Sequence, residues 1–116
     1  MSALAPAQLD DLLAYACALP GASFDVKWGC ERVVSIGGKM FLVCGADALS
    51  YKAPDEDFLP LSGLPGVRPA PYLARARWIQ VRSTEALSLD DLRQGIARSR
   101  ELALQKLPKA QRAAWA

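Results

Sequence analysis

The chain has 116 residues, 52% of them apolar, and a formal net charge of +2. This length fits one domain with its own core, and no apolar run approaches the roughly 20 residues that cross a bilayer. The sequence contains no histidine, which excludes Ser-His-Asp and Cys-His catalytic groups and every histidine-containing zinc pattern. We therefore expect a single domain over residues 1–116 without a membrane partner.

The first expected element is a helix from about Pro6 to Leu19. Proline suits the first turn of a helix, because its φ is already helical and its missing N–H is not needed there. Apolar residues then recur at helical spacing until Pro20 and Gly21 end the element. The apolar stripe consists of Leu9, Leu12, Leu13 and Ala16.

An antiparallel meander is expected next, after a connection that contains Phe24 and Trp28. Gly37-Gly38 separates two β-rich runs, and a two-residue turn of this kind is a strong hairpin signal because it requires positive φ. Another turn precedes a short third strand. The expected strands are Arg32–Ile36, Lys39–Cys44 and Ala48–Lys52.

The middle of the chain predicts a short helix, a loop and a strand. Pro54 and the carboxylates of Asp55-Glu56-Asp57 are typical of a helix start, and Pro60 limits that helix to about two turns. Residues 62–71 are rich in glycine and proline, which favours a loop. Arg77–Arg82 alternates well enough for a strand, and part of Val67–Arg68 can pair with it.

The last expected helix begins at Ser88, with Asp91 placed as in a capping box, and ends near Leu107. The tail after it can fray or, through Trp115, dock on the domain. The buried stripe consists of Leu89, Leu92, Ile96, Ser99 and Ala103.

This order, α-β-β-β-α-β(β)-α, predicts an α+β two-layer sandwich. An antiparallel sheet of four or five strands carries the helices on one face, and its other face is left open. If Leu49, Tyr51, Ile79 and Val81 face the helices, alternation places a second set on the open face. That set is Ser50, Lys52, Trp78, Gln80 and Arg82.

An indole among cations suits single-stranded nucleic acid, since bases stack on the ring and Lys or Arg neutralises phosphate. Trp78 as an ordinary core residue is the alternative. Residues 71–78, with Arg75 and Arg77 and no carboxylate, form a second cationic candidate or an ordinary strand entry. Residues 1–67 carry four basic and eight acidic side chains, and residues 68–116 ten and four. This asymmetry favours an anionic partner for the second half, unless the halves neutralise each other.

The sequence offers no catalytic, metal or cofactor site. Its three cysteines show no metal-binding or disulfide spacing and are expected to be buried apolar residues, although Cys30 lies near Lys27 and Arg32 and could be reactive. No glycine-rich phosphate-binding motif occurs, and helix capping accounts for the acidic residues 55–57. A non-enzymatic protein without a cofactor, located in the cytoplasm, is therefore expected.

Several short motifs resemble the MmcQ/YjbR family in order and spacing over nearly the whole chain. The resemblance implies a two-layer fold similar to frataxin-like and secretion-chaperone-like proteins, and a DNA-binding role through a proposed double-wing sheet, with no established enzymatic activity or cofactor. Members often have histidine before the tryptophan, where this chain has Arg77. The matching residues are Leu19-Pro20-Gly21-Ala22, Trp28-Gly29, Gly38-Lys39-Met40-Phe41, Leu49-Ser50-Tyr51-Lys52, Pro71-Tyr72-Leu73, Trp78-Ile79, Ser99 and Lys106-Leu107.

Two functions follow as hypotheses. The first is DNA or other nucleic-acid binding through the open sheet face and the Arg75/Arg77 segment. The alternative is a protein-interaction or homodimerisation module, in which Trp78 is a hot spot under a partner. The candidate nucleic-acid-binding residues are Lys39, Lys52, Arg75, Arg77, Trp78 and Arg82.

Overall fold

The computed structural model describes residues 3–29 and 31–115. In this part of the chain, six strands form one antiparallel sheet in the order β1-β2-β3-β4-β6-β5. The elements are α1 (Pro6–Cys17), β1 (Ala22–Lys27), β2 (Glu31–Ile36), β3 (Lys39–Cys44), β4 (Leu49–Lys52), α2 (Asp55–Ser62), β5 (Val67–Pro69), the 3-10 turn η1 (Ala74–Ala76), β6 (Trp78–Val81), α3 (Leu89–Leu104) and α4 (Lys109–Arg112).

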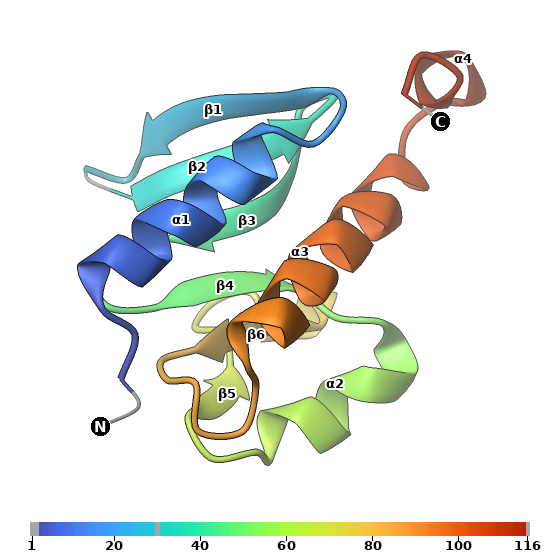
Figure 1. The fold of residues 1–116 in the computed structure, drawn as a ribbon. Helices are drawn as coiled ribbons and strands as arrows, with labels where there is room; N and C mark the ends of the chain where they lie inside the picture. The colour runs from blue at the N-terminus through green and yellow to red at the C-terminus, as the bar shows by residue number, and fades with distance from the viewer. Residues whose placement is uncertain (1–2, 30, 116) are drawn as a thin grey trace.

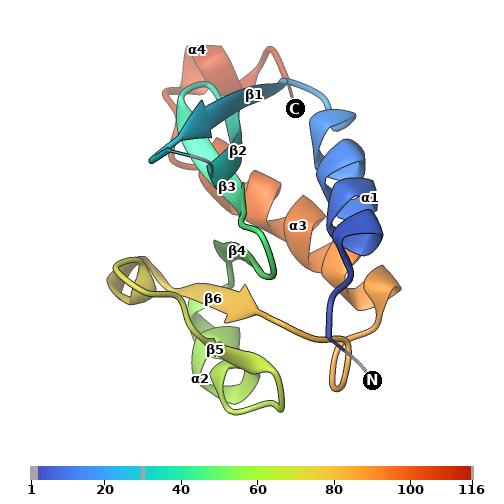
Figure 2. The ribbon, with the colours of Figure 1, turned by 90° about the vertical axis from the view of Figure 1, so that its left-hand side faces the viewer.

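Helices α1 and α3 cover one face of the sheet and pack against each other, as Figures 1 and 2 show. The shorter α2 packs against β5 and β6. The predicted α+β fold, a sheet with helices layered on it, is therefore confirmed. None of the helices in residues 3–29 and 31–115 is long and apolar enough to cross a membrane.

Two parts of the structure differ from the sequence expectation, namely β1 and the end of the last long helix. Strand β1 forms where we expected a connection. Its apolar residues alternate with polar ones, it pairs with β2 at the edge of the sheet, and Phe24 and Val26 are half exposed there. Helix α2 has 8 residues, about two turns as expected, and it includes Pro60; the Ser62 hydroxyl donates to the Phe58 carbonyl at 2.6 Å. Helix α3 ends at Leu104, and the tail then forms the short α4.

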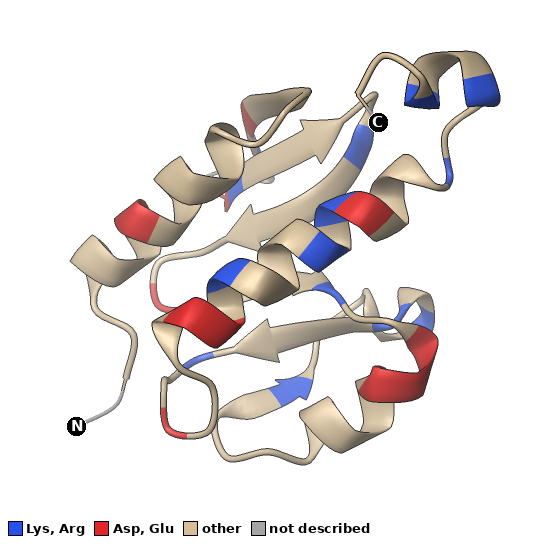
Figure 3. Ribbon diagram, turned by 45° about the vertical axis from the view of Figure 1, so that its right-hand side comes forward, with Lys and Arg blue, Asp and Glu red and all other residues tan. Residues whose placement is uncertain are grey.

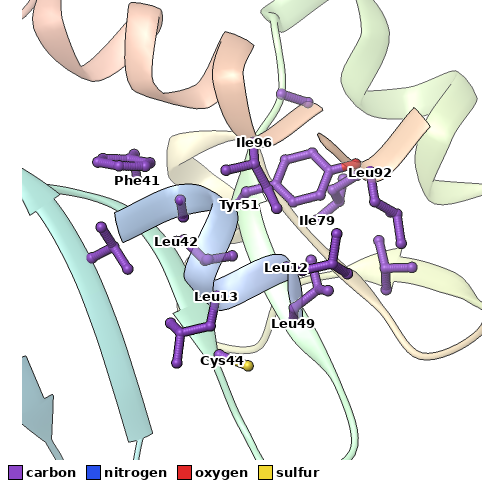
Figure 4. Close-up of a cluster of buried hydrophobic side chains, with 14 of the residues drawn as sticks. Leu12, Leu13, Phe41, Leu42, Cys44, Leu49, Tyr51, Ile79, Leu92 and Ile96 are labelled. Atoms are coloured by element: carbon purple, nitrogen blue, oxygen red, sulfur yellow. The ribbon is translucent and has the colours of Figure 1, made fainter. Parts of the chain in front are cut away.

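The core lies between the sheet and the helices α1 and α3, as Figure 4 shows in close-up. Strands β4 and β6 contribute the apolar residues that alternation predicted for the helix side. The Tyr51 ring packs against α3 at Gly95, where only a residue without a side chain leaves room for it, since a Cβ at Gly95 would lie 2.6 Å from ring carbons. Burial, with a smaller contribution from Asp91, raises the pKa of the Tyr51 hydroxyl.

The C-terminal tail docks on the domain through two residues. The buried guanidinium of Arg100 donates to the carbonyls of Pro20 at 2.9 Å and Trp115 at 3.0 Å, and Glu101 neutralises its charge at 3.1 Å. The Trp115 ring lies against Gly21, where a Cβ would approach it to 2.6 Å. Docking of the tail through Trp115, one of the two predicted outcomes, is therefore confirmed.

The cysteines follow the expectation only in part. Cys44 is buried, and burial raises the pKa of its thiol although Arg32 lies 3.6 Å away. Cys17, the last residue of α1, is exposed, so its expected burial is wrong. The alternative of a reactive Cys30 falls outside the described residues.

Candidate functional site

The face of the sheet opposite α1 and α3 carries one residue of every strand in a continuous row. Residues directly opposite in adjacent antiparallel strands share a face, so the register identifies this row. The row contains two neighbouring valines followed by two polar residues, and a charged residue lies at each edge of the sheet. In spatial order the row is Asp25, Val33, Val43, Ser50, Gln80 and Arg68.

A groove of about 730 Å³ lies on this open face. Three residues of the row, Val43, Ser50 and Gln80, contribute to its lining. The turn between β3 and β4, residues 45–48, forms another part, and the loop after β5 contributes residues 71–73. Three segments far apart in the sequence therefore meet at one concave surface.

Two exposed aromatic side chains line the groove. Trp28, in the turn before β2, is 64% exposed, and Tyr72, in the loop after β5, is fully exposed. Both residues have left-handed backbone conformations, with φ of 51° and 65°. This conformation is uncommon for bulky side chains, and large aromatics usually bury most of their area. Trp28 and Tyr72 thus combine two unfavourable features, which points to a function for the groove.

The groove carries negative charge. Glu31 and Asp47 contribute to its lining, whereas none of the described residues that line it is Lys or Arg. The Glu31 carboxylate lies over Gly45, where a Cβ would be 3.1 Å from its Oε2 atom. The cation at the end of the row, Arg68, donates from Nε to the Gln80 side chain at 2.6 Å.

Trp78 does not form an exposed platform, and that part of the prediction is wrong. The pleat turns its side chain toward the open face, but Trp78 is only 5% exposed. The segment before Trp78 turns back over this end of the sheet. The backbone N–H of Trp78 donates to the Leu73 carbonyl at 3.3 Å, and Leu73 lines the groove together with Ser50. Ser50 is also buried, so neither residue offers a surface for stacking bases.

Lys52 and Arg77 lie close together near α2, at the end of β4 and the start of β6. The Lys52 ammonium donates to the Ala76 carbonyl. Burial lowers the pKa of Lys52; the nearby charges of Lys106 and Arg77 lower it further, whereas the Asp55 carboxylate raises it. The Arg77 guanidinium lies 5.6 Å from the centre of the Phe58 ring and 3.9 Å from the Asp55 carboxylate.

The remaining predicted site residues, Lys39, Arg75 and Arg82, are exposed on three different elements. Lys39 follows the β2–β3 turn, Arg75 lies in η1, and Arg82 follows β6, where its carbonyl accepts from the Leu4 N–H at 3.1 Å. Their contact with nucleic acid stays a prediction. Figure 3 shows further basic positions along α3 and in α4.

Sequence reasoning did not identify Trp28, Glu31 or Asp47 as site residues, and it included Tyr72 only as part of the cationic candidate segment 71–78. A signal was present for the aromatics, since Trp28 precedes a glycine and Tyr72 follows a proline in segments with turn composition. The carboxylates gave no signal, because their position depends on a register between strands. The groove becomes visible only when the loop after β5 is placed over the sheet.

The fold defines a two-layer α+β protein with an open antiparallel sheet. The family model YjbR matches residues 17–102, and the chain therefore belongs to the YjbR family, as its motifs suggested. A crystal structure of the Deinococcus radiodurans protein DR2400, which has a DUF419 domain, matches with a TM-score of 0.80 and 20% identity, covering 90% of this chain and 85% of that chain. The likeness shows a shared fold. No curated protein matches the chain.

Proposed function

We propose that this chain is a non-enzymatic binding protein that receives a partner protein on the open face of its sheet. The supporting observation is the groove lined by the exposed rings of Trp28 and Tyr72. Tryptophan and tyrosine are the residues most often found as hot spots of protein interfaces, where they fill pockets and exclude water. The absence of histidine from the sequence is consistent with a role that needs no general base.

The charge of the groove favours a protein over a nucleic acid on this face. Nucleic-acid affinity comes largely from Lys and Arg contacts to phosphate. The groove instead presents Glu31 and Asp47, which repel phosphate, and the indole of Trp78 is covered. Of the two functions expected from the sequence, the protein-interaction module is therefore the better supported for this surface.

Affinity capture from cell extract tests the proposal when three forms of the protein are compared. The double variant Trp28→Ser/Tyr72→Ser removes both rings, whereas Leu59→Ser removes a 78% exposed apolar side chain on α2, outside the groove. We expect a protein that the parent and Leu59→Ser capture equally and the double variant does not. The purified partner should then shift the amide NMR signals of Val43 and Gln80. Equal capture by all three forms, or shifts elsewhere, would reject the groove.

Nucleic-acid binding is a second candidate, at a different surface. Lys52, Arg98 and Lys106 line a pocket of about 250 Å³ between α2 and α3, and Arg77 is close enough to lower the pKa of Lys52. Asp55 and Glu56 share the pocket and offset part of this charge.

Fluorescence anisotropy with labelled DNA at low and high salt tests this candidate, since binding to phosphate weakens steeply with salt. Arg98→Gln/Lys106→Gln should reduce binding, whereas Trp28→Ser should leave it unchanged. No binding at low salt, or binding that the Arg98/Lys106 variant retains in full, would exclude this surface.

A further inference from the structure

The groove on the open face combines three features that together suit a cationic side chain. Its apolar part includes Val43 and Leu73, its rings are those of Trp28 and Tyr72, and its charges are carboxylates. The long stems of Lys and Arg bind along apolar surface while their charged ends remain polar. The cationic ends are attracted to the faces of aromatic rings and to carboxylates.

We infer that the partner protein presents an Arg or Lys side chain next to an apolar residue, and that this cation binds in the groove between the aromatic rings and the carboxylates of Glu31 and Asp47. The inference rests on the proposed function and names the chemistry of its partner. The apolar residue of the partner covers Val43 and Leu73, and its cation satisfies the charge of the groove.

Charge complementarity distinguishes this partner from a second copy of the chain. Two copies related by a twofold axis through the groove would bring Glu31 and Asp47 of one copy against the same carboxylates of the other, and like charges facing each other weaken an interface. The net charge of the chain is +2, so it does not attract basic peptides in general. Binding of a basic segment here would therefore reflect the local charge of the groove.

Three capped peptides of equal length test the inference. They share a central leucine between glycines and differ in the residues on either side of it, which are arginine, glutamine or glutamate. Binding is followed by the amide NMR signals of Val43, Ser50 and Gln80. We expect the arginine peptide to bind most tightly and the glutamate peptide most weakly.

Two sets of variants locate the binding. Glu31→Gln and Asp47→Asn should each weaken the arginine peptide by about two- to fivefold, the range typical of exposed charge pairs, and should leave the glutamine peptide unchanged. Asp57→Asn, an exposed carboxylate of α2 outside the groove, is the matched control and should have no effect.

The outcomes separate this inference from the proposed function. Equal binding of the arginine, glutamine and glutamate peptides, with signal changes in the groove that Trp28→Ser/Tyr72→Ser abolishes, would overturn the cation preference and leave the groove as a binding site. Arginine-peptide shifts outside the groove would also overturn the inference. So would the absence of shifts with all three peptides, whereas the capture experiment tests the groove independently of them.

Discussion

The hydroxyl of Ser99 in α3 accepts a hydrogen bond from the backbone N–H of Lys52 in β4 at 3.0 Å. The same hydroxyl donates to the carbonyl of Phe41 in β3 at 2.7 Å. The ladder between these strands contains the pairs Val43–Ser50 and Cys44–Leu49. Ser99 is fully buried and connects the two strands where their direct pairing has ended. A side chain of α3 thus takes the place of a direct backbone hydrogen bond between β3 and β4.

Replacing Ser99 by alanine leaves a buried N–H and a buried carbonyl without this partner. We expect Ser99→Ala to lower the free energy of unfolding by about 1–3 kcal/mol, the cost of an unsatisfied buried polar group. Urea denaturation measures the change. Gln94→Ala, at an exposed position of the same helix, is the control and should change stability by less than about 0.5 kcal/mol. A similar value for both variants would contradict the bridging role.

Gly95 is expected to resist a substitution that normally stabilises helices. Alanine is favoured over glycine inside a helix by about 1 kcal/mol. Here the added Cβ would lie 2.6 Å from Tyr51 ring carbons, so we expect Gly95→Ala to destabilise the protein. In a Tyr51→Leu background the clash is absent, and the same change should be neutral or stabilising. Thermal unfolding of the four forms gives the coupling, and additive effects would show that the contact does not matter.

The Tyr51 hydroxyl should make stability fall in alkaline solution. Its pKa is raised in the folded state, while the unfolded chain releases the proton near pH 10. The folded form therefore binds more protons above about pH 10, and the free energy of unfolding decreases as the pH rises beyond that value. Denaturation of the parent and Tyr51→Phe between pH 8 and pH 11 tests this. The decrease should be smaller in the variant, and identical curves would refute the assignment.

Tyr72 offers a test of whether its exposed ring serves folding or binding. Its backbone has φ of 65°, which costs an ordinary residue about 1–2 kcal/mol, and its ring is fully exposed. Glycine adopts this conformation freely but loses more chain entropy on folding. We expect Tyr72→Gly to leave stability unchanged or raise it by up to about 1 kcal/mol. Partner capture should nevertheless be weakened, and a clear loss of stability would assign the ring a structural role.

The side chain of Arg100 binds the C-terminal tail to the domain, so replacing Arg100 should undock the tail. In Arg100→Met the carbonyls of Pro20 and Trp115 lose their donors, at a cost of about 1.5–3 kcal/mol for hydrogen bonds to a charged group. We expect trypsin to cleave at Lys109 and Arg112 more rapidly than in the parent. Arg98→Met, an exposed position of the same helix, is the control. Equal cleavage rates in both variants would separate Arg100 from the docking of the tail.

The elements that sequence analysis placed correctly are those with a strong apolar period. Leu9, Leu12 and Leu13 marked α1, and alternation in β4 and β6 assigned Leu49 and Ile79 to the helix side. The edge strand β1 also alternates, with Ala22, Phe24 and Val26 as its apolar residues, but this short pattern was interpreted as a connection. Apolar periodicity and capping residues therefore account for most of the elements that were placed correctly, because both are local properties of the chain.

The candidate site was harder to predict, because alternation indicates the face of a sheet but not what covers it. Trp78 has the predicted orientation, yet the chain before it returns over the sheet through the left-handed Arg77 and the hydrogen bond to Leu73. The same return brings Tyr72 to the groove. Such non-local placement leaves no periodic signal in the sequence.

The hydrogen bonds of Arg100 to Pro20 and Trp115 join positions 80 and 15 residues apart. A nascent chain released up to α3 already contains every strand of the described sheet, but its Arg100 guanidinium still lacks the Trp115 carbonyl, and Gly21 lacks the indole that covers it. Packing of the corner between α1 and β1 therefore depends on Trp115, so this corner can close only after Trp115 has left the ribosome, although every strand of the described sheet precedes it in the chain.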